Sequence, residues 1–178
     1  MKKHILTPLL TIVVSAALLL GLSFALNGVA EARAQAEHVR LLRTLLPGNT
    51  DFVIEPYTGD DSGIRSVHKG ENGFVIQTRT PGYAADIEML VGVSTQGKVT
   101  GILITDMAET AGLGLEALND HVFLAQLLNT SGEAQVGSGV DAITGATVTS
   151  KAVVRSVNSA VAYVTGADVE SGATSWGG

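Results

Sequence analysis

The sequence predicts an α+β fold in which an N-terminal transmembrane helix is followed by a small antiparallel-sheet domain with flanking helices. Three observations lead to this prediction. The stretch Ile5–Leu26 has no charged residue, three strand-like segments follow one another within residues 74–105, and a segment near the C-terminus gathers valines and alanines on one helical face. A chain of 178 residues has room for one ordinary domain besides the anchor.

The uncharged stretch Ile5–Leu26 is long enough, at about 1.5 Å per helical residue, to cross the ~30 Å hydrocarbon core of a bilayer. Lys2 and Lys3 precede this stretch, so the positive-inside rule places the N-terminus in the cytoplasm. We therefore expect residues 1–28 to form the cytoplasmic N-terminus and a single-pass anchor, with the rest of the chain exported.

A cleaved signal peptide is the alternative interpretation of the same segment. Ala32-Arg33-Ala34 offers small residues at the spacing of a cleavage site. The apolar region of a signal peptide is usually about 7 to 15 residues long, which favours the uncleaved anchor. The domain has the same destination in either case.

The exported part is acidic and lacks cysteine. It holds 9 of the 11 basic residues and all 17 acidic ones, a formal charge of 9 − 17 = −8, which argues against a nucleic-acid partner. Without cysteine the chain has no disulfide and no thiolate metal ligand. The four histidines, His4, His38, His68 and His121, have no paired helical spacing, so we expect no metal site. Redox chemistry would need a bound cofactor.

Residues 29–50 are predicted to form a linking amphipathic helix. Its apolar positions, Ala34, Leu41, Leu42, Leu45 and Leu46, recur at helical spacing until Pro47-Gly48 ends the pattern. Residues 51–73 are rich in Gly, Asp and Ser, which indicates loops with room for one edge strand around Phe52-Val53-Ile54.

The centre of the domain is predicted to be an antiparallel meander. Its strands are Phe74–Thr80, Ile87–Val93 and Val99–Thr105, separated by the turn signals Pro81-Gly82 and Gln96-Gly97.

Two helices are predicted after the meander. The first runs from about Leu115 to Leu128, with a stripe formed by Leu115, Leu118, Val122, Ala125 and Leu128. The second follows a glycine-rich loop; its predicted buried face is Val153, Val154, Val157, Ala160, Val161 and Val164, and its predicted rim is Ser150, Lys151, Arg155, Ser156 and Asn158. The domain is thus expected to span residues 51–166, with a flexible tail at 167–178.

The segment most informative about chemistry is Asp141–Ser150, which joins the glycine-rich loop to the last helix. A helix start offers unpaired backbone N–H groups and the positive end of the helix dipole, so it is a natural seat for a phosphate. Gly145 and Ala146 would let a bulky group approach the backbone. The hydroxyl of Thr147 stands where a phosphate could be esterified.

A simpler interpretation also accounts for the hydroxyls of this segment. Thr144, Thr147, Thr149 or Ser150 could cap the last helix, as such residues commonly do. Hydroxyl content alone favours capping over cofactor binding.

The segment resembles the flavinylation signature of the FMN-binding domain family. This family includes the G subunit of the Rnf-type electron transport complex and the C subunit of the sodium-translocating NADH:quinone reductase. The signature is an Asp, two residues, then Ser/Thr-Gly-Ala-Thr, commonly followed by x-Thr-Ser. The matching residues are Asp141, Thr144, Gly145, Ala146, Thr147, Thr149 and Ser150.

The resemblance implies that FMN is bound covalently through a phosphoester. In the family a flavin transferase moves FMN from FAD onto the last Thr of the Ser/Thr-Gly-Ala-Thr element, which is Thr147 here. The other matching residues are then expected at the cofactor site. Glu109 and Thr110 are further candidates as hydrogen-bonding partners of the flavin, although they could equally brace a turn.

The resemblance extends over most of residues 74–164. Pro81-Gly82-Tyr83, the stretch Ile87–Val93 and Glu109–Gly114 follow one another as the flavin-wrapping segments of the family do. The sequence departs from the family at three places: Met107 and Ala111 replace a frequent His and Pro, and Ala84-Ala85 replaces a glycine-containing pair. These departures bear on contacts with the flavin ring.

The expected function is that of an electron-carrying flavoprotein subunit in a membrane-bound, ion-translocating complex. The resemblance places it at the bacterial inner membrane, beside other membrane subunits, as a redox subunit that does not turn over alone. A quinone-reductase C-type subunit or a stand-alone exported flavoprotein is an alternative within the same chemistry. A flavin-free, membrane-anchored interaction module, with Thr147 as a helix cap, is the alternative of a different class.

Overall fold

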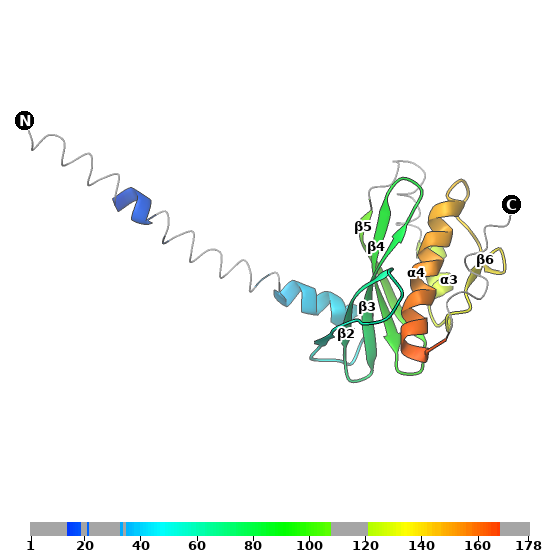
Figure 1. Ribbon diagram of the computed structural model, residues 1–178, viewed down its shortest axis with the longest axis horizontal. Helices are drawn as coiled ribbons and strands as arrows, with labels where there is room; N and C mark the ends of the chain where they lie inside the picture. Colours follow the sequence, from blue (N-terminus) through cyan, green and yellow to red (C-terminus); the bar gives the residue numbers. More distant parts are fainter. Residues whose placement is uncertain (1–13, 19–20, 22–32, 34, 108–120, 168–178) are drawn as a thin grey trace, which may run out of the picture. The chain divides into compact units, whose positions relative to one another are not determined.

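The computed structural model describes residues 14–18, 21, 33, 35–107 and 121–167 (Figure 1). The chain divides into two units, Met1–Arg40 and Leu41–Gly178. In the first unit, residues 14–18 and 35–40 are helical. The second unit contains the sheet, two further helices and every matching residue of the flavinylation signature.

No helix among the described residues combines the length and the apolar character needed to cross a bilayer. Most of the predicted span Ile5–Leu26 falls on residues 1–13, 19–20 and 22–26, which lie outside the described part of the chain. The predicted tail lies outside it from residue 168 onward. The anchor and the tail therefore stay predictions.

Five antiparallel strands form one sheet, in the order in which they occur along the chain. They are β1 (Val53–Glu55), β2 (Ile64–Lys69), β3 (Gly73–Pro81), β4 (Asp86–Ser94) and β5 (Val99–Met107). The predicted meander is confirmed as β3, β4 and β5, and β1 is the expected edge strand. No strand was predicted at β2, because Ile64 and Val67 are its only apolar residues. The segment forms a strand because it pairs with β3, although its sequence lacks the alternation of apolar and polar residues that would have predicted one.

After the sheet come α3 (His121–Leu127), the short parallel strands β6 (Gln135–Val136) and β7 (Gly139–Val140), and α4 (Thr147–Thr165). α4 packs against one face of the sheet, mainly on β3 and β4. The main core includes Ile76, Ile87, Met89, Val91 and Val93 from the sheet and Val153, Val154, Val157, Ala160 and Val161 from α4. Because alternate residues of a strand face opposite sides, Val75 and Leu90 point away from α4.

The second face of the sheet is covered by residues 42–46, which precede β1. Leu42, Leu45 and Leu46 form a smaller core with Val75 and Leu90. The backbone of Leu45 comes very close to the sheet where Gly92 and Gly101 are cross-strand partners. Thr100 donates its hydroxyl to the Leu45 carbonyl at 2.6 Å. Two glycines opposite each other thus make room for the incoming chain.

The predicted stripe of the first helix is wrong for its described members. Val122 and Leu128 are exposed at 74% and 40%, and Ala125 is exposed as well. Phe123 and Leu127 are the residues that α3 buries. The predicted stripe and the Phe123–Leu127 stripe both have helical spacing. The helix buries the stripe that contains the phenylalanine, because its large ring gains most from burial. Residues 115–120 of the predicted helix lie outside the described part of the chain.

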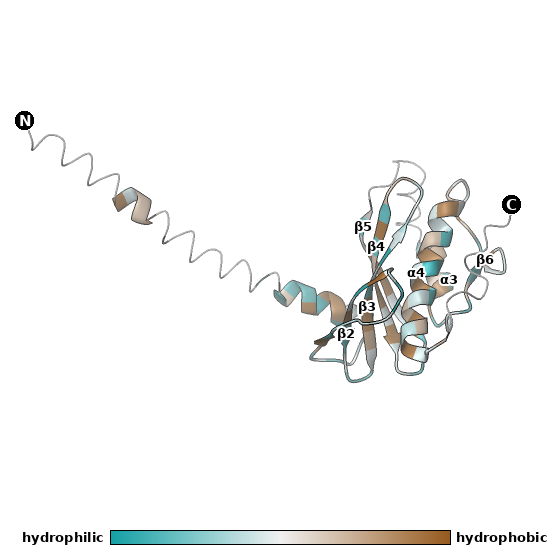
Figure 2. Cartoon of the chain, in the orientation of Figure 1, coloured by the Kyte–Doolittle hydropathy of each residue, from teal (hydrophilic) through white to brown (hydrophobic). Residues whose placement is uncertain are grey.

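α4 confirms its predicted valine face, except that Val164 is only half-buried. Its predicted rim is wrong at Ser150, Ser156 and Asn158, which are at most 4% exposed. Polar positions alternate with apolar ones along this helix (Figure 2). Two of these side chains form hydrogen bonds inside the domain: Ser156 and Thr80 share one of 2.7 Å, and the Asn158 Nδ2 donates to the Ala134 carbonyl at 2.8 Å.

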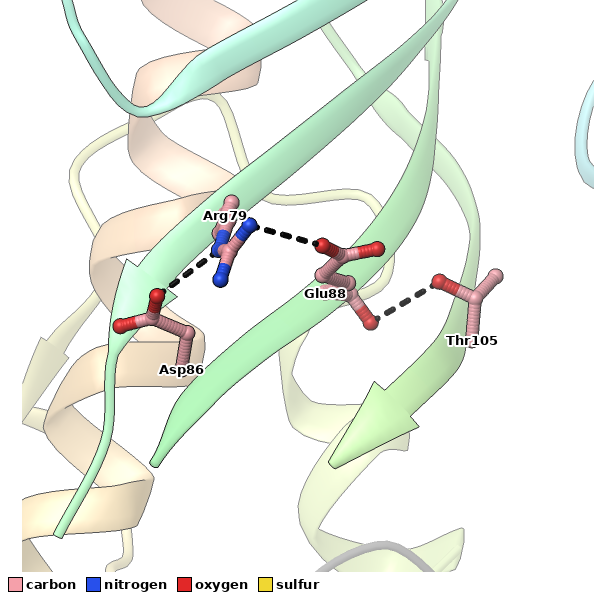
Figure 3. Close-up of polar contacts among 4 residues, drawn as sticks. All are labelled: Arg79, Asp86, Glu88 and Thr105. Carbon is pink, nitrogen blue, oxygen red and sulfur yellow. Dashed lines mark hydrogen bonds and ion pairs between the residues drawn. The ribbon is translucent and has the colours of Figure 1, made fainter. Parts of the chain in front are cut away.

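Polar contacts tie the end of the β3–β4 hairpin together on the face away from α4 (Figure 3). Arg79 pairs with Asp86 at 2.8 Å and with Glu88 at 3.5 Å. The hydroxyl of Thr105 donates to the Glu88 carbonyl at 3.2 Å, which links β5 to the pair. Surface ion pairs contribute about 0 to 1 kcal/mol each, so these contacts set local geometry more than stability.

The close approach at Gly92 predicts a graded stability loss. A Cβ at Gly92 would overlap the carbonyl oxygen of Leu45, whereas one at Gly101 would lie 3.0 Å from it. We expect Gly92→Ala to lower the free energy of unfolding by about 1 to 3 kcal/mol, as overpacking does, and Gly101→Ala to lower it by less. Urea unfolding followed by circular dichroism measures both. Equal losses would contradict this packing.

Candidate functional site

The loop Asp141–Ala146 leads directly into α4, and Thr147 is the first residue of the helix. Asp141, Thr144, Gly145 and Thr147 are exposed. The other predicted site residues of the segment, Ala146, Thr149 and Ser150, are buried. The hydroxyl-bearing side chains therefore divide into an exposed set, which includes Thr147, and an internal set. Glu109 and Thr110 lie outside the described part of the chain.

No side chain caps the start of α4. The residue before the helix is Ala146, with φ −124° and ψ 36°, and the helix has no side-chain cap hydrogen bond. Thr147 lies inside the helix rather than at the capping position. The interpretation of Thr147 as a helix cap is therefore wrong, and a residue that could have capped the helix is exposed at its first position.

A tight turn shapes the loop immediately before Thr147. The Ala146 N–H donates to the Ile143 carbonyl at 3.0 Å, which closes a four-residue turn. Gly145 occupies the third position of this turn with φ 79°. A positive φ at that position defines a type II turn and favours glycine, because side chains with a Cβ are strained there.

Two side chains hold the loop from outside the turn. Ser150 accepts a hydrogen bond from the Ile143 N–H at 3.1 Å and donates to the Ala146 carbonyl at 2.9 Å. Gln126 of α3 accepts from the Asp141 N–H at 2.8 Å. Gln126 was not among the predicted site residues. No sequence signal marks it, because its contact with the loop exists only once α3 is folded beside it.

The start of α4 has an electrostatic preference for anions. The amides of a first helical turn lack intrahelical partners, and the helix dipole adds a partial positive charge there. The first turn of α4 carries no acidic residue that would neutralise this charge. A phosphate group at this end of the helix would therefore be stabilised.

A groove of about 600 Å³ lies beside the loop. This volume is within the range of roughly 300 to 1,000 Å³ that is typical of small-molecule sites. The groove is lined by Val122, Phe123 and Gln126 from α3 and by Asp141, Ala142, Ile143 and Thr144 from the loop. Its walls thus combine apolar surface with a few polar groups, which is the usual composition of a binding site.

Residues 82–162 match the FMN-binding domain family, and this range contains β4, β5, α3, the whole loop and α4 as far as Ala162.

Three relatives identify the family more narrowly. The G subunit of an ion-translocating oxidoreductase complex from Methanosarcina acetivorans is 33% identical over 92% of this chain and 96% of its own length. A protein of the same name from Pseudomonas aeruginosa is 32% identical over 83% of this chain and 86% of its own length. The G subunit of a Na⁺-translocating ferredoxin:NAD⁺ oxidoreductase complex from Acetobacterium woodii is 39% identical over 50% of this chain, and that alignment covers 47% of the relative.

The chain therefore belongs to the family of G subunits of ion-translocating oxidoreductase complexes, as the resemblance of its signature indicated.

The turn before Thr147 predicts a specific tolerance at Gly145. We expect Gly145→Ala to lower the free energy of unfolding by about 1 to 2 kcal/mol, because L-residues pay this amount at positive φ. Gly145→Asn is expected to cost less, since asparagine visits this conformation more readily. Thermal and urea unfolding compare the two variants. An alanine that is tolerated better than asparagine would show that the turn differs from the one described.

Proposed function

We propose that this chain is an electron-carrying flavoprotein subunit of a membrane-bound, ion-translocating oxidoreductase complex, with FMN attached through a phosphoester to the hydroxyl of Thr147. The support is of two kinds: membership in the G-subunit family, whose relatives are named as parts of such complexes, and the surroundings of Thr147.

One observation carries the proposal: Thr147 is exposed at the first position of an uncapped helix, at the end of a loop that matches the flavinylation signature. A hydroxyl that accepts a phosphoryl group must be reachable by the enzyme that transfers it. The product phosphate must then be tolerated, and the unneutralised start of α4 favours its negative charge.

The residues around Thr147 fit FMN. Backbone N–H groups at the start of α4 would hold the phosphate, and the groove beside Asp141 and Thr144 offers apolar walls for a ring system. When bound, FMN supplies one- and two-electron redox chemistry, which no side chain of this cysteine-free chain provides. The chain's own contribution is to fix the position of the cofactor and to retain it by a covalent bond.

The proposed organisation places residues 1–28 as cytoplasmic N-terminus and membrane anchor, residues 29–50 as a linking helix, and residues 51–166 as an FMN-binding domain outside the cytoplasm. The uncharged stretch Ile5–Leu26 and the flanking Lys2 and Lys3 support this topology. The partners would be the other membrane subunits of the complex and, during maturation, a flavin transferase. A covalent bond would prevent loss of the cofactor at a site away from cytoplasmic flavin.

Attachment is tested by intact mass and visible absorbance of the chain co-expressed with a flavin transferase. We expect the parent protein to gain the mass of one FMN and a yellow colour that survives denaturation. Thr147→Ala should lose both completely, because alanine has no oxygen to form the ester. Thr165→Ala is the matched control, since Thr165 is an exposed threonine at the other end of α4.

A colourless, unmodified parent would overturn the proposal and leave the flavin-free interaction module as the better interpretation. Retention of the adduct in Thr147→Ala would place the attachment on another hydroxyl. A stand-alone flavoprotein differs from a complex subunit by purifying without other membrane proteins.

The proposed topology is tested by a single introduced cysteine, because the chain has none of its own. Thr95 lies exposed between β4 and β5, so Thr95→Cys is expected to leave the fold intact. A membrane-impermeant maleimide should label this variant in intact cells, after permeabilisation of an outer membrane where one exists. A cysteine that is labelled only after the cytoplasmic membrane is broken would contradict an exported domain.

A further inference from the structure

Ser150 is a signature residue whose surroundings point to a role other than contact with a cofactor. Its side chain is 0% exposed, so it presents no surface to a ligand. Its hydroxyl is engaged in two hydrogen bonds, one from the Ile143 N–H at 3.1 Å and one to the Ala146 carbonyl at 2.9 Å. Both partners belong to the loop that precedes Thr147.

These two bonds connect the first turn of α4 to both ends of the turn before it. Ile143 and Ala146 are also the residues whose backbone bond, at 3.0 Å, closes the type II turn. Ser150 therefore holds the turn shut from inside the protein. Further back, Gln126 holds the Asp141 N–H at 2.8 Å. The exposed Thr144 and Gly145 are left at the tip of a loop fixed on both sides.

We propose that Ser150 is a positioning residue for flavin transfer, which fixes the turn 143–146 so that the Thr147 hydroxyl is presented in one conformation. This inference rests on the proposed attachment of FMN to Thr147. In that transfer the Thr147 oxygen forms a bond to the flavin-side phosphorus of FAD and the pyrophosphate P–O bond breaks. AMP leaves with the bridging oxygen, and the hydroxyl proton passes to a base of the transferase.

Ser150 acts by preorganising the Thr147 hydroxyl. A nucleophile that is already fixed reacts faster than one that must be ordered in each encounter, since the loss of conformational freedom is not added to the barrier. Without the Ser150 hydroxyl, the Ile143 N–H loses its partner and the turn can open. The Thr147 hydroxyl would still be present and able to react, but it would spend less time in the reactive orientation.

α4 contains a matched control for this idea. Ser156 lies on the same helix, is also 0% exposed, and has its hydroxyl in a hydrogen bond of 2.7 Å with Thr80. Its partner belongs to the sheet and not to the loop. Ser150→Ala and Ser156→Ala therefore remove the same group from equally buried positions of one helix, and only the first change touches the turn.

The experiment measures the rate at which the detergent-solubilised full chain gains the mass of FMN when mixed with flavin transferase and FAD. We expect Ser150→Ala to be slowed roughly tenfold or more, since small displacements of a reacting group have effects of this size or larger. Ser156→Ala is expected to remain within about twofold of the parent, because the turn is intact. Thermal unfolding of both variants compares their losses of stability.

Hydrogen exchange at the Ile143 amide gives a second readout that does not depend on flavin. It should be faster in Ser150→Ala and unchanged in Ser156→Ala. Ser150→Cys, which keeps a γ atom in place of the hydroxyl oxygen but forms only weak hydrogen bonds, is expected to be slowed as well, and it decides the question if the alanine variant does not fold.

The outcomes distinguish a failure of the proposed function from a failure of the positioning role. A parent chain that accepts no FMN would overturn the proposed function itself. A parent that is labelled while Ser150→Ala or Ser150→Cys is labelled equally fast would overturn the positioning role alone. Equal slowing of Ser150→Ala and Ser156→Ala would also overturn it, because the effect would then reflect general stability.

Discussion

The packing of α4 across the sheet is the interaction on which the rest of the domain depends. It buries the valines and alanines of the helix against β3 and β4, at roughly 1.5 to 3 kcal/mol for each large apolar side chain. It also fixes where the helix begins. Since Thr147 is the first residue of α4, the same contacts that build the core determine where the site stands.

The buried polar residues of α4 fix the position and rotation of the helix more narrowly than its apolar contacts do. Hydrophobic packing tolerates sliding and rotation, whereas a hydrogen bond requires one geometry. The bonds of Ser156 to Thr80 and of Asn158 to Ala134 connect α4 to the sheet on one side and to the loop after α3 on the other. A buried hydroxyl or amide without its partner would be costly, so these pairs oppose any shift of the helix.

The opposite face of the sheet connects the domain to the segment before it. There the backbone of Leu45 rests on Gly92 and Gly101, and the Thr100 hydroxyl holds the Leu45 carbonyl. The site and the chain entry therefore lie on the two faces of one antiparallel sheet. In the proposed function, the sheet is the rigid body that carries the flavin site at a fixed position relative to the end of the linking helix.

The sequence by itself determined the three central strands, the valine face of α4 and the loop that leads to Thr147, because hydrophobic periodicity, glycine positions and a signature are local properties. Tertiary structure alone decided that β2 pairs with β3, that α3 buries Phe123 rather than Val122, and that Ser150, Ser156 and Asn158 lie inside. It also brought Gln126 to Asp141. Each of these depends on a partner distant in the chain, and no local pattern contains that partner.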